Sequence, residues 1–330
     1  MIQGNIVKPE DPGAKDYEKN YYGMISRNLT SIYDDAPYIS SYAFYSYRSF
    51  TEASFPNASF IGSSCFNTCL NLSLVNAPKC EYIGSYAFCS CSSLASITLN
   101  KSKISIIEMS AFWGCSNLGA ASFPECSFVN TGAFAFCESL SILYFPKCES
   151  IGMSAFSYCD NLESAYFPEC SSIAAYAFAR CKKLSTVSFP KCESVGMGAF
   201  QMCSSLTDVY LPMCEYVGIY AFMWCSVLES ITLPSCRTIA ASAFSSCTNL
   251  KEIRINNCTT INSYAFAKCY SLSDVYLVGS TVCGLGSYVF SETLINSSGG
   301  TGRVHVASSL YSDYCVDPRW SDISSNIVSY

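Results

Sequence analysis

Apolar residues recur along this chain in a unit that repeats at a fixed spacing. In one such unit Leu162, Ala165 and Phe167 stand at positions i, i+3 and i+5. Because Ala165 and Phe167 differ by two positions, their side chains share one face of a short strand. Pro168 follows at once and ends the strand, since proline cannot donate to a strand ladder. The pattern predicts a short inward-facing strand over residues 162–167, followed by a return half that carries Phe178.

One phenylalanine of the unit marks its period. Nine of the eleven steps between successive copies are 22 residues and two are 24. Fifteen cysteines from Cys115 to Cys269 stand on an unbroken eleven-residue spacing, so each unit carries two of them. A period between 20 and 29 residues is typical of a leucine-rich-repeat solenoid, in which each coil packs only on its neighbours. The marker residues are Phe44, Phe66, Phe88, Phe112, Phe134, Phe156, Phe178, Phe200, Phe222, Phe244, Phe266 and Phe290.

The predicted fold class is therefore a repeat solenoid of parallel β coils, about 12 units of 22 residues each. We expect three parts along the chain. Residues 1–28 form an irregular N-terminal extension, and residues 29–290 form the leucine-rich-repeat solenoid. Residues 291–330 form an α/β cap with a strand at 303–306, because an open array exposes an apolar end that needs a lid.

The repeat unit resembles a known family. Its pattern of leucine, isoleucine, Phe-Pro, cysteine and Ala-Phe resembles the BspA-like (Treponema-type) leucine-rich repeats of bacterial and protozoan surface proteins. The resemblance covers roughly residues 29–290, and the tail from Val304 through Trp320 to Ile327 is similar to the cap that closes such arrays. The resemblance implies adhesion or binding to a host surface, as in some members of that family.

Composition and charge exclude several classes of partner. Half of the 330 residues are apolar, 13% are charged, and the net charge is −6 with a pI near 4.9. An acidic chain argues against nucleic acid, which calls for a basic face. No apolar run approaches 18 residues, so no membrane span is expected. Residues 1–19 lack the apolar region of a secretory signal. Another export route, a signal missing from this chain, or no export all stay open.

The cysteines allow three interpretations: buried thiols, disulfides or metal ligands. Free cysteine is small, apolar and often buried. Neighbouring rungs of a parallel sheet are ~4.8 Å apart, whereas the Cβ atoms of a disulfide are ~3.8 Å apart. We therefore expect reduced core thiols on the grid, no metal site and no cofactor. The exceptions expected to behave differently are the off-grid cysteines Cys65, Cys69, Cys89, Cys91, Cys283 and Cys315.

Catalytic chemistry has little support in the sequence. The chain has one histidine, His305, which falls in the expected cap strand and is interpreted as an ordinary cap residue. A serine or cysteine nucleophile needs a base within reach. With a single histidine, we predict that the protein is not an enzyme.

The outward strand positions hold the candidate site. In each strand the residue between the inward pair faces solvent, and these residues are rich in Tyr, Ser and Thr. Tyrosine offers a rigid amphipathic contact and serine an adaptable hydrogen bond. Aromatic and β-branched residues also simply suit exposed strand positions, so this alternative stays open. We call the following seven residues the stripe: Tyr144, Tyr166, Ser188, Tyr210, Thr232, Arg254 and Tyr276.

The sequence favours a non-enzymatic binding or adhesion module, extracellular or at the cell surface and acting as a monomer. Its expected partner is a protein or glycan on a host or neighbouring cell, engaged by the stripe. Two alternatives stay open: a phage or prophage tail component that contacts a receptor, and a purely structural spacer. A second series of tyrosines precedes the Ala-Phe pair on the opposite side, at Tyr42, Tyr86, Tyr176, Tyr220, Tyr264 and Tyr288.

Overall fold

A computed structural model of the chain describes residues 30–49, 51–296 and 300–330. Within these ranges the chain forms a β-solenoid of parallel coils about 22 residues apart, and helix is confined to residues 308–326. The predicted fold class is therefore confirmed. The predicted extension, residues 1–28, lies outside the described residues, and the three predicted domain boundaries stay predictions.

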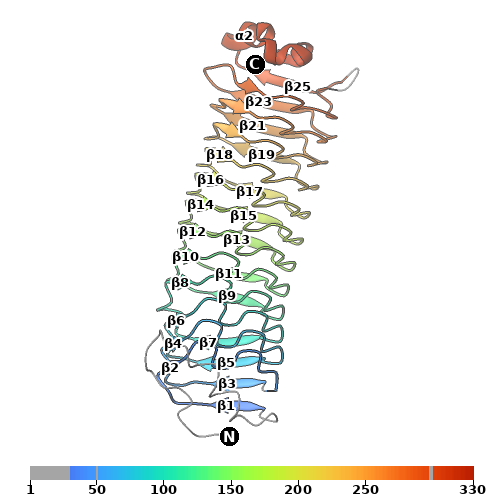
Figure 1. Cartoon of the computed structure of the whole chain (residues 1–330). Helices are drawn as coiled ribbons and strands as arrows, with labels where there is room; N and C mark the ends of the chain where they lie inside the picture. Colours follow the sequence, from blue (N-terminus) through green and yellow to red (C-terminus); the bar gives the residue numbers. More distant parts are fainter. Residues whose placement is uncertain (1–29, 50, 297–299) are drawn as a thin grey trace. The chain divides into compact units, whose positions relative to one another are not determined.

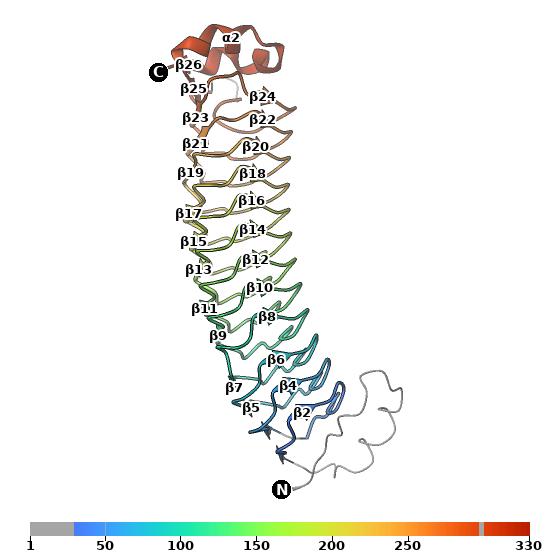
Figure 2. The same cartoon turned by 90° about the vertical axis from the view of Figure 1, so that its left-hand side faces the viewer.

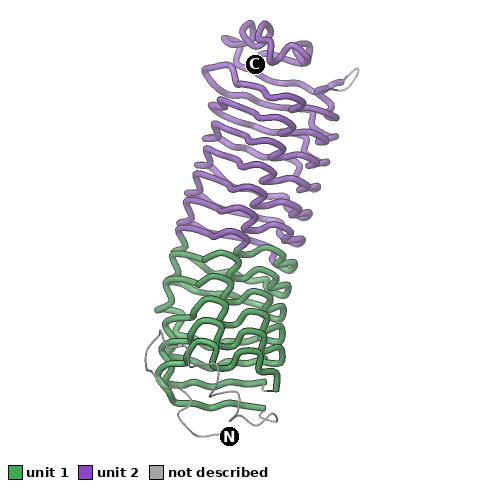
Figure 3. Tube along the Cα trace, in the orientation of Figure 1, with its two compact units in different colours: residues 1–148, 155–161 green, residues 149–154, 162–330 purple. Residues whose placement is uncertain are grey.

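Two compact units make up the chain, and both follow the same plan. Unit 1 comprises residues 1–148 and 155–161, and unit 2 comprises residues 149–154 and 162–330 (Figure 3). In each unit every coil contributes one longer strand and one two-residue strand, and these form two separate columns (Figures 1 and 2). Neighbours in a column pair in parallel and in register, as Ala53 does with Val75 and Val187 with Val209.

Unit 1 has eleven strands among its described residues. The longer ones are β1 (Ser31–Tyr33), β3 (Glu52–Ser54), β5 (Leu74–Ala77), β7 (Ser96–Leu99), β9 (Ala120–Ser122) and β11 (Ile142–Tyr144). The short ones are β2 (Tyr38–Ile39), β4 (Phe60–Ile61), β6 (Tyr82–Ile83), β8 (Ile106–Ile107) and β10 (Phe128–Val129). The ladders stop at β7 and at β6, where the first 24-residue step falls. Phe88 and Phe112 nevertheless stack across this step, with ring centroids 5.5 Å apart.

Unit 2 continues the same alternation and ends in a cap. Its longer strands are β13 (Ser164–Tyr166), β15 (Thr186–Ser188), β17 (Asp208–Tyr210), β19 (Ser230–Leu233), β21 (Glu252–Asn256) and β23 (Asp274–Val278). Its short strands are β12 (Ser150–Ile151), β14 (Ser172–Ile173), β16 (Ser194–Val195), β18 (Tyr216–Val217), β20 (Thr238–Ile239), β22 (Thr260–Ile261) and β24 (Gly284–Leu285). The cap comprises β25 (Arg303–Val306), the 3₁₀ helix η1 (Ser308–Leu310), α2 (Tyr311–Val316), the 3₁₀ helix η2 (Pro318–Asn326) and β26 (Ile327–Ser329).

The core consists of stacked rings, as the spacing predicts. Phe178, Phe200 and Phe222 are fully buried, and their successive ring centroids lie 5.5 and 5.3 Å apart. Phe167 meets Phe178 edge-on at 6.0 Å from the other half of the coil. Burying each ring contributes roughly 1.5–3 kcal/mol to folding. The repeated phenylalanine therefore provides ring stacking from one coil to the next.

The grid cysteines form two columns with different hydrogen bonds. A thiol that follows the Ala-Phe pair donates to the preceding coil, as Cys203 does to the Phe178 carbonyl at 3.2 Å and Cys225 to the Phe200 carbonyl at 3.2 Å. A thiol that follows the proline donates within its own coil, as Cys214 does to the Tyr216 carbonyl at 3.3 Å. All 22 cysteines lie among the described residues and none is bridged.

The segments around each Ala-Phe pair hold an unusual backbone conformation. Two residues four positions apart have positive φ, as Tyr176 (58°) and Arg180 (62°) do. Left-handed backbone is unfavourable for residues other than glycine, yet only a few of these positions are glycine. The second tyrosine series, including Tyr220 (58°) and Tyr264 (60°), falls on the first of the two positions. These tyrosines therefore occupy turns and not strands.

The cap closes the C-terminal end of unit 2. Strand β25 pairs with β23, and β26 pairs with β25, so that β26 takes the last edge of this sheet. Helix α2 lies above the last coil together with η2 (Figure 1). Trp320 and Tyr314 are buried between this lid and the coil, with their rings edge-on at 5.1 Å. No helix among the described residues is both long and apolar enough to cross a bilayer.

Candidate binding surface

The strands place the stripe residues between buried neighbours. In β13, Tyr166 stands between Ala165 and Phe167, which are both buried, and its side chain is 63% exposed. Tyr210 of β17 is 58% exposed. A tyrosine held in this way keeps its backbone fixed by the ladder while its ring stays in solvent. Such a ring offers contact area at a small cost in conformational entropy.

Three stripe residues lie on adjacent strands of one ladder. Tyr166 is in register with Ser188, and Ser188 with Tyr210. Since neighbouring strands lie about 4.8 Å apart, the two tyrosines flank Ser188 at about 10 Å from each other along the ladder. The serine side chain is short and half-buried. The register therefore places one exposed tyrosine on either side of Ser188.

Polar groups lie beside these two tyrosines on the same strands. Ser164, Thr186 and Asp208 form the parallel row two positions earlier, again in register. The Asp208 carboxylate is exposed and accepts a hydrogen bond from the Thr207 hydroxyl at 3.0 Å. Rings beside hydroxyl and carboxylate groups suit a ligand with both apolar faces and hydroxyls.

The C-terminal part of the stripe is a stack of flat side chains. Thr232, Arg254 and Tyr276 are in register on β19, β21 and β23. The Arg254 guanidinium carbon lies 3.8 Å from the centroid of the Tyr276 ring. On the other side of that ring, His305 of β25 stacks at 4.2 Å with an angle of 9° between the planes. The faces of Tyr276 are thus covered, and this part presents ring edges to solvent.

Two carboxylates hold the stack. Glu252 accepts a hydrogen bond from Arg254 Nε at 2.6 Å, and Asp274 contacts His305 Nε2 at 2.7 Å. Burial by itself raises the pKa of Asp274, but hydrogen bonds from His305 and Ser273 and the electrostatic interactions with His305 and Arg254 outweigh it. The pKa of Asp274 therefore lies below its ordinary value. The hydrogen bond to Glu252 raises the pKa of Arg254.

This cluster lacks the arrangement of a hydrolytic triad. The Ser273 hydroxyl donates to Asp274 Oδ2 at 2.7 Å, the same carboxylate that His305 contacts. A triad requires the serine to bond the imidazole and the carboxylate to orient that imidazole. Here both groups bond the carboxylate, so the imidazole is not placed to take the serine proton. Among the described residues no group of three or more His, Cys, Asp or Glu side chains is placed to hold a metal ion.

Tyr144 is the one stripe residue that belongs to unit 1. It lies on β11 in unit 1, where it is in register with Ser122 of β9. Its side chain is 55% exposed, and Ile142 on the same strand is 61% exposed. Unit 1 therefore has an exposed aromatic and aliphatic pair of its own at this strand position.

The sequence analysis missed the role of His305. It was assigned to the cap, and it does lie on cap strand β25, but it also extends the stripe by one rung. The signal was present in the alternation Val304-His305-Val306, which repeats the alternation Val275-Tyr276-Leu277 of the strand before it. The long connection between β23 and β25 hid that correspondence.

A second exposed surface lies at the turns. In unit 2 it includes Tyr220, Trp224 and Met197, which are 37%, 43% and 40% exposed. Tyr264 and Tyr288 stack there at 5.3 Å. All of these side chains except Met197 project from left-handed turn residues, and none has the strand support of the stripe.

The comparisons with known proteins place the repeat region in one family. The sequence profile described as BspA type leucine rich repeat region (6 copies) matches residues 37–163, 127–222 and 193–303. A comparison with curated proteins finds no match.

Several solved structures are similar to this chain. A leucine rich cell surface protein from Faecalibacterium prausnitzii is 23% identical, with 77% of this chain and 84% of that chain covered and a TM-score of 0.40. A leucine-rich repeat protein from Bacteroides ovatus is 23% identical, with 76% and 79% covered and a TM-score of 0.49. The leucine-rich repeat protein of T. pallidum is 26% identical, with 54% and 78% covered and a TM-score of 0.44.

Proposed function

Because the chain belongs to the BspA-type leucine-rich repeat family, we propose that it is a non-enzymatic binding module that engages a protein or glycan on another surface. The stripe is the proposed contact surface, and the proposed setting is extracellular or at the cell surface. The observation that carries the proposal is the pair Tyr166 and Tyr210, which are 63% and 58% exposed on either side of Ser188.

The physical argument concerns what such rings gain from a partner. A tyrosine that is already more than half exposed loses a large apolar area from water when a ligand covers it. That burial is worth ~25 cal/mol per Å². Its backbone is fixed by the ladder, so little entropy is lost on binding. Ser188 lies between the two tyrosines along the ladder, and Asp208 and Thr186 on the same strands can meet polar groups of the partner.

The test is a binding screen with matched variants of the full chain. The immobilised protein is probed with a glycan array and with a panel of extracellular-matrix and cell-surface proteins. The stripe variant changes Tyr144, Tyr166 and Tyr210 to Ser, and the control changes Tyr176, Tyr220 and Tyr264 to Ser at the turns. We expect the stripe variant to lose about tenfold or more in affinity, since each covered tyrosine contributes ~1 kcal/mol or more. The control should bind as the unchanged protein does.

Circular dichroism decides whether a loss of binding is a loss of fold. Both variants should keep the spectrum and the thermal midpoint of the unchanged protein, because five of the six side chains are exposed and the sixth, Tyr176, is only half-buried. If the control variant loses binding and the stripe variant keeps it, the turn surface is the contact surface. If the unchanged protein retains nothing from either panel, the spacer alternative is favoured.

A further inference from the structure

Two cysteines near the cap approach each other unusually closely. The Sγ atoms of Cys258 and Cys283 are 2.8 Å apart. Thiol hydrogen bonds elsewhere in the chain are longer, such as the 3.0 Å bond from Cys91 to the Phe66 carbonyl and the 3.2 Å bond from Cys192 to the Ser194 carbonyl. A disulfide bond is ~2.0 Å long. The two sulfurs therefore need to move by less than 1 Å to be joined.

The approach has a cause in the register of the last coil. Earlier in this column each thiol donates to the carbonyl two residues on, as Cys170 does to Ser172 and Cys192 does to Ser194. In the last coil Gly284 is in register with Thr260, so Cys283 is opposite Thr259 and one position away from the expected place. The second 24-residue step falls in this coil. The displaced thiol consequently points at Cys258 of the coil before.

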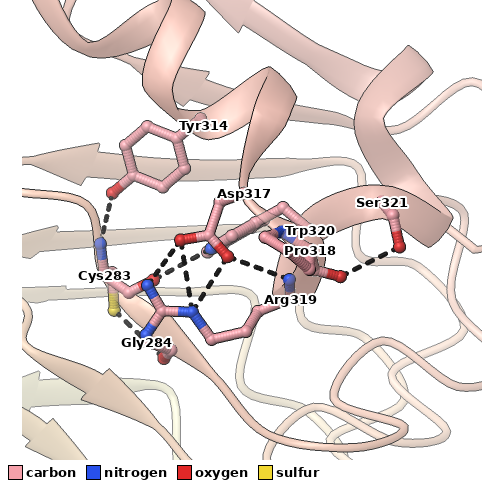
Figure 4. A network of polar contacts seen from close by, with 8 residues as sticks. All are labelled: Cys283, Gly284, Tyr314, Asp317, Pro318, Arg319, Trp320 and Ser321. Atoms are coloured by element: carbon pink, nitrogen blue, oxygen red, sulfur yellow. Dashed lines mark hydrogen bonds and ion pairs between the residues drawn. The ribbon is translucent and has the colours of Figure 1, made fainter.

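The cap fixes Cys283 in this position. The Cys283 backbone N–H donates to the Tyr314 hydroxyl at 2.9 Å, and Trp320 Nε1 donates to the Cys283 carbonyl at 2.9 Å (Figure 4). The Arg319 side chain lies over Gly284, the next residue. The cap therefore packs on the coil that carries Cys283. A disulfide at Cys283 would join that coil to the preceding one.

We propose that Cys258 and Cys283 form a disulfide when the full chain folds in an oxidising setting, and that this disulfide anchors the capped last coil. The oxidant is a low-molecular-weight disulfide such as oxidised glutathione. One cysteine thiolate attacks it and releases one glutathione thiolate. The second cysteine thiolate then attacks the mixed disulfide and releases the other. The two cysteine thiols lose two protons and two electrons, and the oxidant becomes two thiols.

The burial of the two thiols determines when the disulfide can form. Cys258 is 5% exposed and Cys283 is fully buried, so the folded protein shields both from the oxidant. The hydrogen bond with Cys283, followed by burial, also raises the pKa of the Cys258 thiol, and the thiol is less reactive than the thiolate. The bond therefore forms during folding, before the cap closes, or during a local opening of the cap.

Peptide mapping tests the bond directly. The full chain is refolded with oxidised and reduced glutathione, quenched in acid, alkylated and digested. We expect a cross-linked peptide pair containing Cys258 and Cys283, lighter by two hydrogens than the sum of the two peptides. Cys89 is half-exposed and serves as the internal control for oxidant activity. Recovery of both peptides fully alkylated, in a sample whose Cys89 is oxidised, would overturn the proposal. A bond from Cys258 to any other cysteine would overturn it as well.

Thermal unfolding of matched variants tests the anchoring. The oxidised protein should melt several degrees above the same sample after reduction. Cys283→Ala should abolish this difference, whereas Cys236→Ala, in the neighbouring coil of the same column, should keep it. An equal midpoint for the oxidised and reduced unchanged protein, with the cross-link present, would show that the bond does not anchor the cap. The mapping of the unchanged protein stands even if a variant fails to fold.

Discussion

A buried thiol in this protein satisfies both packing and hydrogen bonding at one position. Cys203 fills apolar space between coils and also donates to the Phe178 carbonyl of the preceding coil. Burial raises the pKa of the Cys203 thiol to about 12, so it stays neutral. Alanine at this place would remove one of the two donors to that carbonyl, which also accepts a hydrogen bond from the Cys181 backbone N–H at 3.3 Å, and serine would bury a more polar group. These two requirements, packing and a hydrogen-bond donor, explain why cysteine recurs at both places in the coils from Cys115 to Cys269.

The ring positions give the sharpest prediction at the residue scale. Phe178→Ala should lower the free energy of unfolding by ~3–5 kcal/mol, because it removes a ring that stacks on Phe200 and meets Phe167 edge-on. Chemical denaturation followed by circular dichroism measures the change. Tyr210→Ser, at an exposed place in the same unit, is the control and should change the free energy by little. An unchanged midpoint for Phe178→Ala would contradict the assignment of this ring to the core.

The inward residues could be predicted because they repeat at fixed offsets within the unit. Leu162, Ala165 and Phe167 are all buried, as their spacing requires. The short contact between Cys258 and Cys283 could not be predicted in this way. It depends on where the two extra residues of the last coil are accommodated, and periodicity gives only their number.

At the scale of one element, the left-handed backbone of the turn segments could not be predicted from the sequence. Each segment needs two left-handed residues, yet the chain places Tyr, Ser, Arg or Met there more often than glycine. Turn prediction relies on glycine at positive φ, so it finds few of these positions. The ladder of backbone bonds holds the conformation instead: Ser246 N donates to the Ala267 carbonyl at 2.8 Å, as Gly114 N does to the Ala135 carbonyl.

A matched pair of substitutions tests the backbone strain. Ser246 (φ 62°) and Gly114 (φ 70°) occupy the same place in their coils. Ser246→Gly should raise stability by about 0.5–1 kcal/mol, since the relief of left-handed strain exceeds the entropy cost of glycine. Gly114→Ala should lower stability by about 1 kcal/mol. The added Cβ makes only ordinary contacts there, the nearest at 3.6 Å from Ser90 Cα. Denaturant midpoints with equal slopes measure both changes, and shifts of the same sign would contradict the argument.

The cap predicts a dependence on acid pH. Asp317 begins η2 by accepting a hydrogen bond from Arg319 N at 2.9 Å, and it also bonds the Arg319 guanidinium. The hydrogen bond from the Arg319 side chain, aided by the one from its backbone, lowers the pKa of Asp317 from 3.8 to about 2. Because the folded pKa is depressed, the carboxylate stabilises the cap fully above about pH 4. That contribution is lost as the pH falls towards 2.

Asp317→Asn isolates this contribution. The folded and unfolded pKa values of Asp317 set the range of the test at pH 5 to pH 2. Over this range the thermal midpoint of the unchanged protein should fall further than that of Asp317→Asn, and the difference between the two falls should be at most a few degrees. Asp322→Asn, an exposed carboxylate of the same helix, should follow the unchanged protein. Parallel curves for all three proteins would show that the Asp317–Arg319 pair does not support the cap.

At the scale of the whole molecule, a long repetitive chain presents many similar surface positions and few that differ. The family assignment follows from the repeats, whereas the ligand depends on single outward residues that the repeats do not constrain. The exposure of their rings distinguishes the outward tyrosines from one another. Tyr166 and Tyr210 are more than half exposed, whereas Tyr276 is covered by Arg254 and His305. The outward strand positions could be predicted from the sequence, but which of their rings stay open to solvent and which are stacked could not. That division depends on which side chains stack.

The proposed contact surface is tested most directly by tyrosine protection in the complex. The protein is nitrated with tetranitromethane, alone and with the ligand retained in the binding screen, and each tyrosine peptide is quantified by mass spectrometry. We predict that the ligand lowers nitration of Tyr166 and Tyr210 and leaves that of Tyr220, Tyr264 and Tyr288 unchanged. Protection of the turn tyrosines, with Tyr166 and Tyr210 as reactive as in the free protein, would contradict the account.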